Sequence, residues 1–233
     1  PGVVERLARS AGLAGDAASM LDELAAIDLQ RVGGQASRVE IEGLLQLSEP
    51  RQRNLLRYAI RRAGLPVPGA ARLATVIDTV LHAREDAQPL VAWQGAELRR
   101  YRGTLYLLPP LGETAWPPAG RALGAGPLAL GAGMGTLRLA PGASRGLSDS
   151  ILERGLSVRG RRGGEEIKPA AQAPTKKLRK LLQDEGVVPW MRDRLPLVYA
   201  GDELVAVADL WLAADAVSEP GTAVYWDDRP ELY

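Results

Sequence analysis

The chain has 233 residues, 46% of them hydrophobic, with 29 Lys and Arg against 28 Asp and Glu and no cysteine. This length allows one or two domains, and a chain that begins at Pro1 indicates a piece of a longer protein. Without cysteine there is no disulfide or thiolate metal site, no apolar run reaches the roughly 18 residues of a membrane span, and no secretory signal leads the chain.

The first part of the chain predicts a mainly helical domain. Apolar residues recur at helical spacing over 1–35, 48–63 and 69–83, with a short extended piece near 39–41. Ser48 followed by Pro50 is a typical helix start. Strands at 90–93 and 98–108, the second with a tight turn at Arg102-Gly103, would add a small β-hairpin. We assign 1–19 to a helical lead-in from an upstream domain outside this chain, and 20–108 to the first domain.

The second part predicts a small mixed sheet with one helix. Residues 109–127 are rich in proline and glycine and indicate a linker. The sequence then predicts short strands at 128–130, 136–139, 156–159, 166–168 and 210–212, a helix at 175–185, and a hairpin of 195–200 with 203–207. We assign 128–212 to this second domain and 213–233 to an acidic, partly disordered tail. The expected fold class is therefore α+β.

Two rows of cations stand out within an almost neutral chain. Arg53, Arg57 and Arg61 repeat every four residues along one helix, where like charges repel by a few tenths of a kcal/mol per pair. They are explained either by phosphate contact or by a solvated face that acids elsewhere neutralise. In the helix 175–185 the leucines at 178, 181 and 182 share one face, so its basic residues should point to solvent, as suits a polyanion.

Net charge is distributed unevenly between the two ends of the chain. Residues 1–194 hold 28 basic against 20 acidic side chains, whereas residues 195–233 hold one against eight. Most of the cations are arginine, which suits bidentate contact with phosphate. We therefore expect an anionic partner for the basic part of the chain.

No arrangement of residues in this sequence predicts catalysis or metal binding. His82 is the only histidine, and no nucleophile–histidine–acid pattern surrounds it. The glycine-rich stretch 131–135 is followed by strand-like alternation rather than a helix start, so it predicts a turn and not a phosphate loop. In each of the acidic pairs 165–166 and 227–228, neighbouring side chains of an extended chain would point to opposite faces. Neither pair is therefore preorganised to bind a metal or to act as acid and base.

A 25-residue string in the second domain carries the most information. A helix with Lys177-Leu178 and Lys180-Leu181 precedes Gly186-Val187-Val188-Pro189-Trp190-Met191-Arg192-Asp193-Arg194 and then Pro196-Leu197-Val198-Tyr199. This string resembles the C-terminal domain of bacterial tRNA(Ile)-lysidine synthetase, with Val188 in place of the family's usual first proline. A weaker resemblance to the family's substrate-binding domain lies in Arg84-Glu85-Asp86-Ala87 and in residues 98–106. The resemblance covers most of 20–212.

This resemblance implies tRNA recognition as part of a ligase. The family uses ATP, with Mg, and lysine to convert the wobble cytidine of an isoleucine tRNA with a CAU anticodon to lysidine. The family's Ser-Gly-Gly-x-Asp-Ser pyrophosphatase loop does not occur in these residues, so the chain alone is expected to be inactive, without a cofactor of its own. The resemblance further implies a cytoplasmic protein that does not bind membranes, and its architecture allows a homodimer.

The predicted tRNA contacts are the basic side chains of these rows and of the segments around the string. They are Arg53, Arg57, Arg61, Arg159, Arg161, Arg162, Lys176, Lys177, Arg179, Lys180, Arg192 and Arg194. Arg192 or Arg194 could instead pair with Asp193 or Asp184. Trp190 has two interpretations, stacking on a base or packing in the core, and the second is favoured because the domain lacks phenylalanine.

Two other functions are compatible with the same residues. The chain could be a protein-interaction module whose basic faces bind an acidic partner or its own acidic tail. A freestanding enzyme is disfavoured because no catalytic set is assembled.

Overall fold

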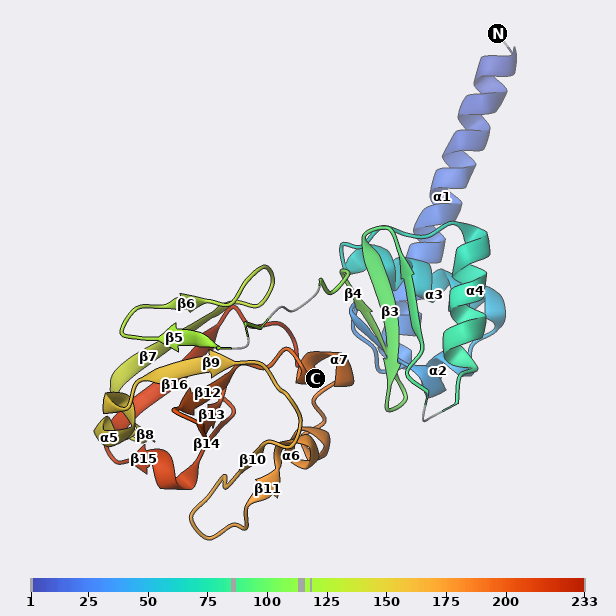
Figure 1. Ribbon diagram of the computed structural model, residues 1–233. Coiled ribbons are helices and arrows are strands. Elements are labelled where there is room, and N and C mark those ends of the chain that lie inside the picture. The colour runs from blue at the N-terminus through green and yellow to red at the C-terminus, as the bar shows by residue number, and fades with distance from the viewer. Residues whose placement is uncertain (1, 85–86, 113–115, 118, 233) are drawn as a thin grey trace. The chain divides into compact units, whose positions relative to one another are not determined.

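The computed structural model describes residues 2–84, 87–112, 116–117 and 119–232 of the chain. The chain forms two compact units, Pro1–Gly112 and Glu113–Tyr233, shown in Figure 1. The boundary between the units falls inside the stretch 109–127 that was predicted as a linker. Glu85 and Asp86, which belong to the weaker of the two sequence resemblances, lie outside the described residues. No helix among the described residues is long and apolar enough to cross a bilayer.

The described part of unit 1 contains helices at the three places that helical spacing predicted, and one further short helix, α2, that was not predicted. They are α1 (Gly2–Arg31), α2 (Ile41–Leu45), α3 (Glu49–Arg62) and α4 (Ala70–Leu81). Ser48 has the extended backbone of an N-cap, although its side chain makes no capping hydrogen bond. Residue 41 was expected to be extended but begins α2, because Ile41 and Leu44 are both buried and only a helical turn directs the two side chains into the same core.

A four-stranded antiparallel sheet packs against these helices. Its order is β1-β4-β3-β2, from β1 (Arg38–Glu40), β4 (Thr104–Leu108), β3 (Ala96–Tyr101) and β2 (Leu90–Trp93). The predicted hairpin is confirmed and lies in the middle of this larger sheet. Figure 1 shows α3 and α4 on one side of β3 and β4, and Leu98, Leu105 and Leu107 are buried in the shared core with Leu55 and Val76 of these helices.

Two buried charged groups hold unit 1 together. Asp28 of α1 is fully buried, and Arg51 Nε of α3 donates to its carboxylate at 3.0 Å. Arg100 of β3 donates from Nη1 to the carbonyl oxygens of Val80, Leu81 and Ala83 at 2.9–3.1 Å. A guanidinium at this place satisfies the free carbonyls at the C-terminal end of α4 and complements the helix dipole.

Unit 2 is built mainly of strands and is more elaborate than the predicted single small sheet. One five-stranded sheet has the order β14-β13-β12-β9-β5 and the other β15-β8-β16-β7-β6, while β10 and β11 form a separate two-stranded ribbon. The strands are β5 (Arg121–Leu123), β6 (Leu128–Ala129), β7 (Thr136–Ala143), β8 (Gly146–Leu147), β9 (Leu156–Arg159), β10 (Glu166–Ile167), β11 (Lys176–Lys177), β12 (Leu197–Ala200), β13 (Glu203–Val207), β14 (Trp211–Leu212), β15 (Val217–Ser218) and β16 (Gly221–Asp227). Short helices accompany them, namely α5 (Asp149–Glu153), α6 (Leu178–Asp184), α7 (Pro189–Arg192) and the 3-10 helix η1 (Ala214–Ala216).

Three sequence predictions for unit 2 differ from the structure. The expected linker 109–127 contains β5, which pairs with β9. The helix expected from residue 175 begins only at Leu178, because Lys176 and Lys177 pair with β10 as a strand. Residues 213–232 are not a loose tail: β16 pairs with both β7 and β8, since Thr222, Val224 and Trp226 alternate into the core. The α+β class itself is confirmed.

Candidate nucleic-acid interface

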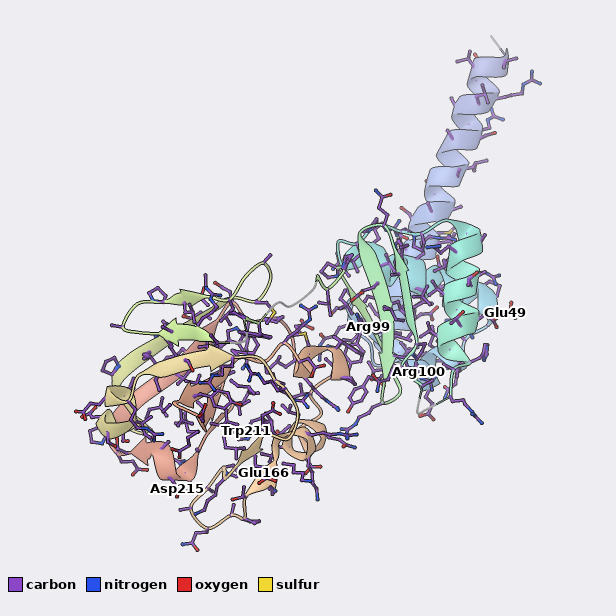
Figure 2. The ribbon with its side chains drawn as sticks, viewed as in Figure 1. Glu49, Arg99, Arg100, Glu166, Trp211 and Asp215 are labelled. Atoms are coloured by element: carbon purple, nitrogen blue, oxygen red, sulfur yellow. The ribbon has the colours of Figure 1, made fainter. Side chains whose placement is uncertain are left out.

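The ribbon and α6 of unit 2 present four basic side chains to solvent. Leu178, Leu181 and Leu182 anchor the buried face of α6, as their spacing predicted. We define the α6 cation patch as Lys176, Lys177, Arg179 and Lys180, of which Lys176 is half-buried and the other three are exposed. None of the four forms an ion pair with a described residue, although Glu166, labelled in Figure 2, lies opposite Lys177 across the ribbon.

The loop 160–165 next to the ribbon is held by one carboxylate. Glu165 accepts hydrogen bonds from the backbone N–H groups of Arg162 and Gly163, the latter at 2.8 Å, and its side chain is only 8% exposed. Burial by itself opposes ionisation, but these hydrogen bonds and the nearby guanidinium of Arg161 outweigh it, so the pKa of Glu165 is lowered. The carboxylate is therefore charged at neutral pH and fixes the backbone that carries exposed Arg162.

Arg159 and Arg161, two of the predicted RNA contacts, use their guanidinium groups within unit 2. Arg159 lies 4.7 Å from the ring centre of Tyr199 and donates to the carbonyl of Gly201 at 2.6 Å. Arg161 is 13% exposed and donates to Asp193 at 3.0 Å. The contacts of Arg159 stabilise the turn between β12 and β13, and those of Arg161 stabilise the loop 160–165.

The string after α6 is also partly buried. Arg192 Nε donates to the carbonyl of Val187 at 2.8 Å, and Arg194 Nη1 lies 4.0 Å from the sulfur of Met134. Asp193, one of the two acids considered as their partner along with Asp184, forms an ion pair with Arg161. Trp190 is half-buried, whereas its neighbour Met191 is fully buried, so both interpretations of Trp190 stay open.

The arginine row on α3 of unit 1 divides in two. Arg53 pairs with Glu49 at 3.3 Å, and Arg61 pairs with Asp22 of α1. Arg57 between them is exposed and forms no ion pair with a described residue. Because exposed pairs such as Arg53–Glu49 contribute little, both alternatives for this row stay open, with Arg57 as its freest cation.

The acidic end of the chain is neutralised inside unit 2. Among the described residues, ion pairs join at least six of these acids to cations, and in five of these pairs the cation comes from an earlier strand or loop. The pairs are Asp202–Arg159, Glu203–Arg154, Asp209–Arg229, Asp215–Lys168, Glu219–Arg145 and Asp227–Arg138. The predicted tail therefore belongs to the fold and is not a free ligand for the α6 cation patch.

The remaining candidates from the sequence, His82 and residues 131–135, belong to different units in the part of the chain that the structure describes. His82 is exposed at the C-terminal end of α4 and lines a cavity of about 210 Å³ with Glu49 and Asp78. Among the described residues, no group of three or more histidine, aspartate or glutamate side chains is placed to hold a metal ion. Residues 131–135 form the predicted turn, in which the N–H of Leu130 donates to the carbonyl of Gly135 at 2.9 Å.

Comparison with known proteins finds a matching domain model for each of the two units. Residues 40–106 match the model described as TilS substrate binding domain, and residues 156–226 match the TilS substrate C-terminal domain. The chain is 37% identical to the tRNA(Ile)-lysidine synthase of Alkalilimnicola ehrlichii over 223 residues, covering 95% of this chain and 49% of that protein. It is likewise 37% identical to that of Coxiella burnetii, covering 89% of this chain and 46% of the relative.

These matches define the chain first as a pair of substrate-binding domains. The chain spans about half the length of the curated relatives it matches. It belongs to the tRNA(Ile)-lysidine synthase family, as the resemblance in its sequence predicted.

Proposed function

We propose that this chain is the tRNA-recognition part of an ATP-dependent tRNA(Ile)-lysidine synthase. The observation that carries the proposal is the α6 cation patch, which lies within the residues matched to the TilS substrate C-terminal domain. Unpaired surface cations displace counterions from a nucleic-acid backbone, which is the main source of affinity for RNA phosphates. Duplex RNA also offers a shallow minor groove and 2′-hydroxyls that a small rigid domain can contact.

The proposal extends to the whole protein and its reaction. The substrate would be the isoleucine tRNA with a CAU anticodon, whose wobble cytidine becomes lysidine at the expense of ATP, with Mg and free lysine. The part of the protein that performs this chemistry would correspond to the half of the relatives that this chain does not match. A cytoplasmic location and a homodimeric state belong to the same proposal. Sedimentation of the full-length protein with tRNA tests whether it is a homodimer.

The first test is tRNA binding across a salt titration. The chain is titrated with the isoleucine tRNA that carries a CAU anticodon and with elongator methionine tRNA, which shares that anticodon. We expect salt-dependent binding that is tighter for the isoleucine tRNA, because only the tRNA body differs between them. Equal affinity would assign discrimination to the rest of the protein. A lack of binding to either tRNA near 0.1 M salt would contradict the proposed function and favour the interaction-module alternative.

A further inference from the structure

The sheet of unit 1 carries aromatic rings on the face that points away from its core. Leu98, Arg100 and Leu105 point inward, so strand alternation directs Tyr101 and Tyr106 to the opposite face. Tyr106 lies opposite Arg99 in register, which makes Tyr101 its diagonal neighbour across β3 and β4. Both tyrosines are half-buried, so each keeps part of its surface accessible.

Guanidinium groups lie against these rings. Arg38 of β1 lies 5.7 Å from the ring centre of Tyr106, and Arg102 lies 5.1 Å from that of Tyr101. Arg102 reaches back over its neighbour because the turn has left-handed backbone, with φ of 48° at Arg102 and 82° at Gly103. We define the tyrosine face as Arg38, Arg99, Tyr101, Arg102 and Tyr106.

The acids on this face are already engaged. Glu97 accepts a hydrogen bond from Arg99 Nε at 3.0 Å and is nearly buried, and Glu40 accepts one from the hydroxyl of Thr104 at 2.9 Å. Burial raises the pKa of Tyr106, with opposing contributions from nearby charges, so its phenol is neutral in the physiological range. The face therefore offers flat neutral rings with flat cations stacked on them, and little net charge.

This chemistry differs from that of the α6 cation patch. Isolated lysines and arginines contact phosphates, whereas tyrosine rings and arginine planes stack on bases, and a base is accessible only where RNA is unpaired. A guanidinium that is already held against a ring can present its other side to a base at little further cost in side-chain entropy.

We infer that the tyrosine face of unit 1 binds unpaired bases of an RNA. The identity of that RNA as tRNA rests on the proposed function, but the stacking site is carried by the geometry of β1, β3 and β4. The face lies within or next to the residues 40–106 that match the substrate binding domain, whose other sheet face is occupied by the core. The two units would thus bind the same molecule by different chemistry, bases at the first and phosphates at the second.

The test compares tRNA affinity for paired variants of the full chain. Changing Tyr101→Leu and Tyr106→Leu together should weaken binding by about tenfold or more with an unchanged dependence on salt, because stacking releases no counterions. The Tyr101→Phe and Tyr106→Phe pair should bind within about twofold of the unchanged protein, since phenylalanine keeps the ring. Tyr225→Leu is the matched control: Tyr225 is exposed on a strand of unit 2 with Arg138 4.3 Å from its ring centre, but that arginine pairs with Asp227.

A second measurement needs no substitution. Ultraviolet crosslinking of tRNA to the unchanged chain, followed by mass spectrometry, should place crosslinks on a peptide that contains Tyr101 or Tyr106. Crosslinks confined to unit 2, or a leucine pair that folds and binds normally, would overturn the inference. Equal weakening by the phenylalanine pair would overturn it too, because the hydroxyls rather than the rings would then carry the contact.

The experiments distinguish a failure of the proposed function from a failure of the base-binding inference. If the leucine pair binds normally but neutralising the α6 cation patch weakens binding, the proposed function stands and the tyrosine face is not a base-binding site. If the unchanged chain binds no tRNA, the proposed function fails. A single-stranded oligoribonucleotide then tests the tyrosine face alone, and lack of binding by the unchanged chain would overturn the inference as well.

Discussion

Glu165 shows how a single carboxylate can organise several basic residues. Its oxygens bind the backbone of Arg162 and Gly163, and its charge lies 3.7 Å from Arg161 Nε. In sequence it belongs to an acidic pair that shows no preorganisation for chemistry. The side chain of Glu165 is largely buried, whereas its neighbour Glu166 is exposed.

The lowered pKa of Glu165 predicts a pH-dependent contribution to the stability of unit 2. A lowered folded-state pKa stabilises the fold above the ordinary carboxyl pKa, near 4.3, and the contribution is lost as pH falls through the folded value. Glu165→Gln should therefore lower the free energy of unfolding by about 1–3 kcal/mol at pH 7, and this difference should shrink below about pH 4. Urea titrations followed by tryptophan fluorescence measure it, because four of the five tryptophans lie in unit 2.

The exposed neighbour Glu166 supplies the control for this measurement. Glu166→Gln should change the free energy of unfolding by no more than about 0.5 kcal/mol at either pH. A Glu165→Gln difference that does not change with pH would show that the loop depends on the shape of the side chain and not on its charge.

At the scale of the element, α6 has cations where its own stability does not need them. Arg179 and Lys180 lie in the first turn, where the helix dipole disfavours positive charge. The leucine face is sufficient to hold α6 on the unit, and Leu178 N–H donates to the carbonyl of Glu165 at 2.8 Å. The cations are thus free to contact a partner without being required by the fold.

Neutralising the α6 cation patch is therefore expected to separate binding from stability. Changing Lys176, Arg179 and Lys180 together to Gln should weaken tRNA binding and flatten the dependence of log K on log salt by up to about 3 units. The melting temperature should stay within a few degrees, since the dipole gains slightly from the change. Electrophoretic or anisotropy titrations at several salt concentrations measure the slope.

A matched control removes the same charge elsewhere in unit 2. The control variant combines Arg121→Gln, Arg145→Gln and Arg154→Gln. These arginines belong to β5 or lie next to β8 and α5, elements that are away from α6 in Figure 1. This variant should lose less affinity and less salt dependence. Equal losses in the two triple variants would indicate a general effect of net charge and contradict the assignment of the patch.

At the scale of the whole molecule, charge and sheet topology depend on each other. The acidic end of the chain supplies β16, which pairs with β7 and β8, and its carboxylates meet cations from much earlier residues. Leu232 is buried, and its carbonyl accepts the N–H of Val188 at 3.0 Å. The uneven distribution of charge along the sequence is therefore explained mainly by ion pairs within unit 2, in which acids of the chain end meet cations of earlier residues.

Removal of residues 217–233 should consequently unfold unit 2. The truncation deletes β16, the central strand of a five-stranded sheet, together with the carboxylates of Glu219 and Asp227, which pair with Arg145 and Arg138. We expect loss of the unfolding transition reported by tryptophan fluorescence, with the helical circular dichroism of unit 1 retained. The control deletes residues 1–17, which are exposed wherever the structure describes them, and should leave both transitions within about 1 kcal/mol.

Much of the fold follows from local patterns that can be read along the chain. The helix periods of α3 and α4, the glycine turns and the hairpin of β12 with β13 all have sequence signals and are confirmed. The short α2, the strand β5 inside a proline- and glycine-rich stretch and the central β16 do not, because segments of three to seven residues are fixed by their long-range pairing partners.

By itself, the sequence determined the family, the α+β class and the amphipathic design of α6, because each depends on residue types and spacings within a short window. Only the tertiary structure decided which cations are used up by the fold, since Arg159–Asp202 and Arg61–Asp22 join residues about forty positions apart. The same applies to Tyr101 and Tyr106, which become one surface with Arg38 only when β1 pairs with β4. An ion pair or a sheet face is a matter of spatial neighbours, and the order of residues along the chain does not specify them.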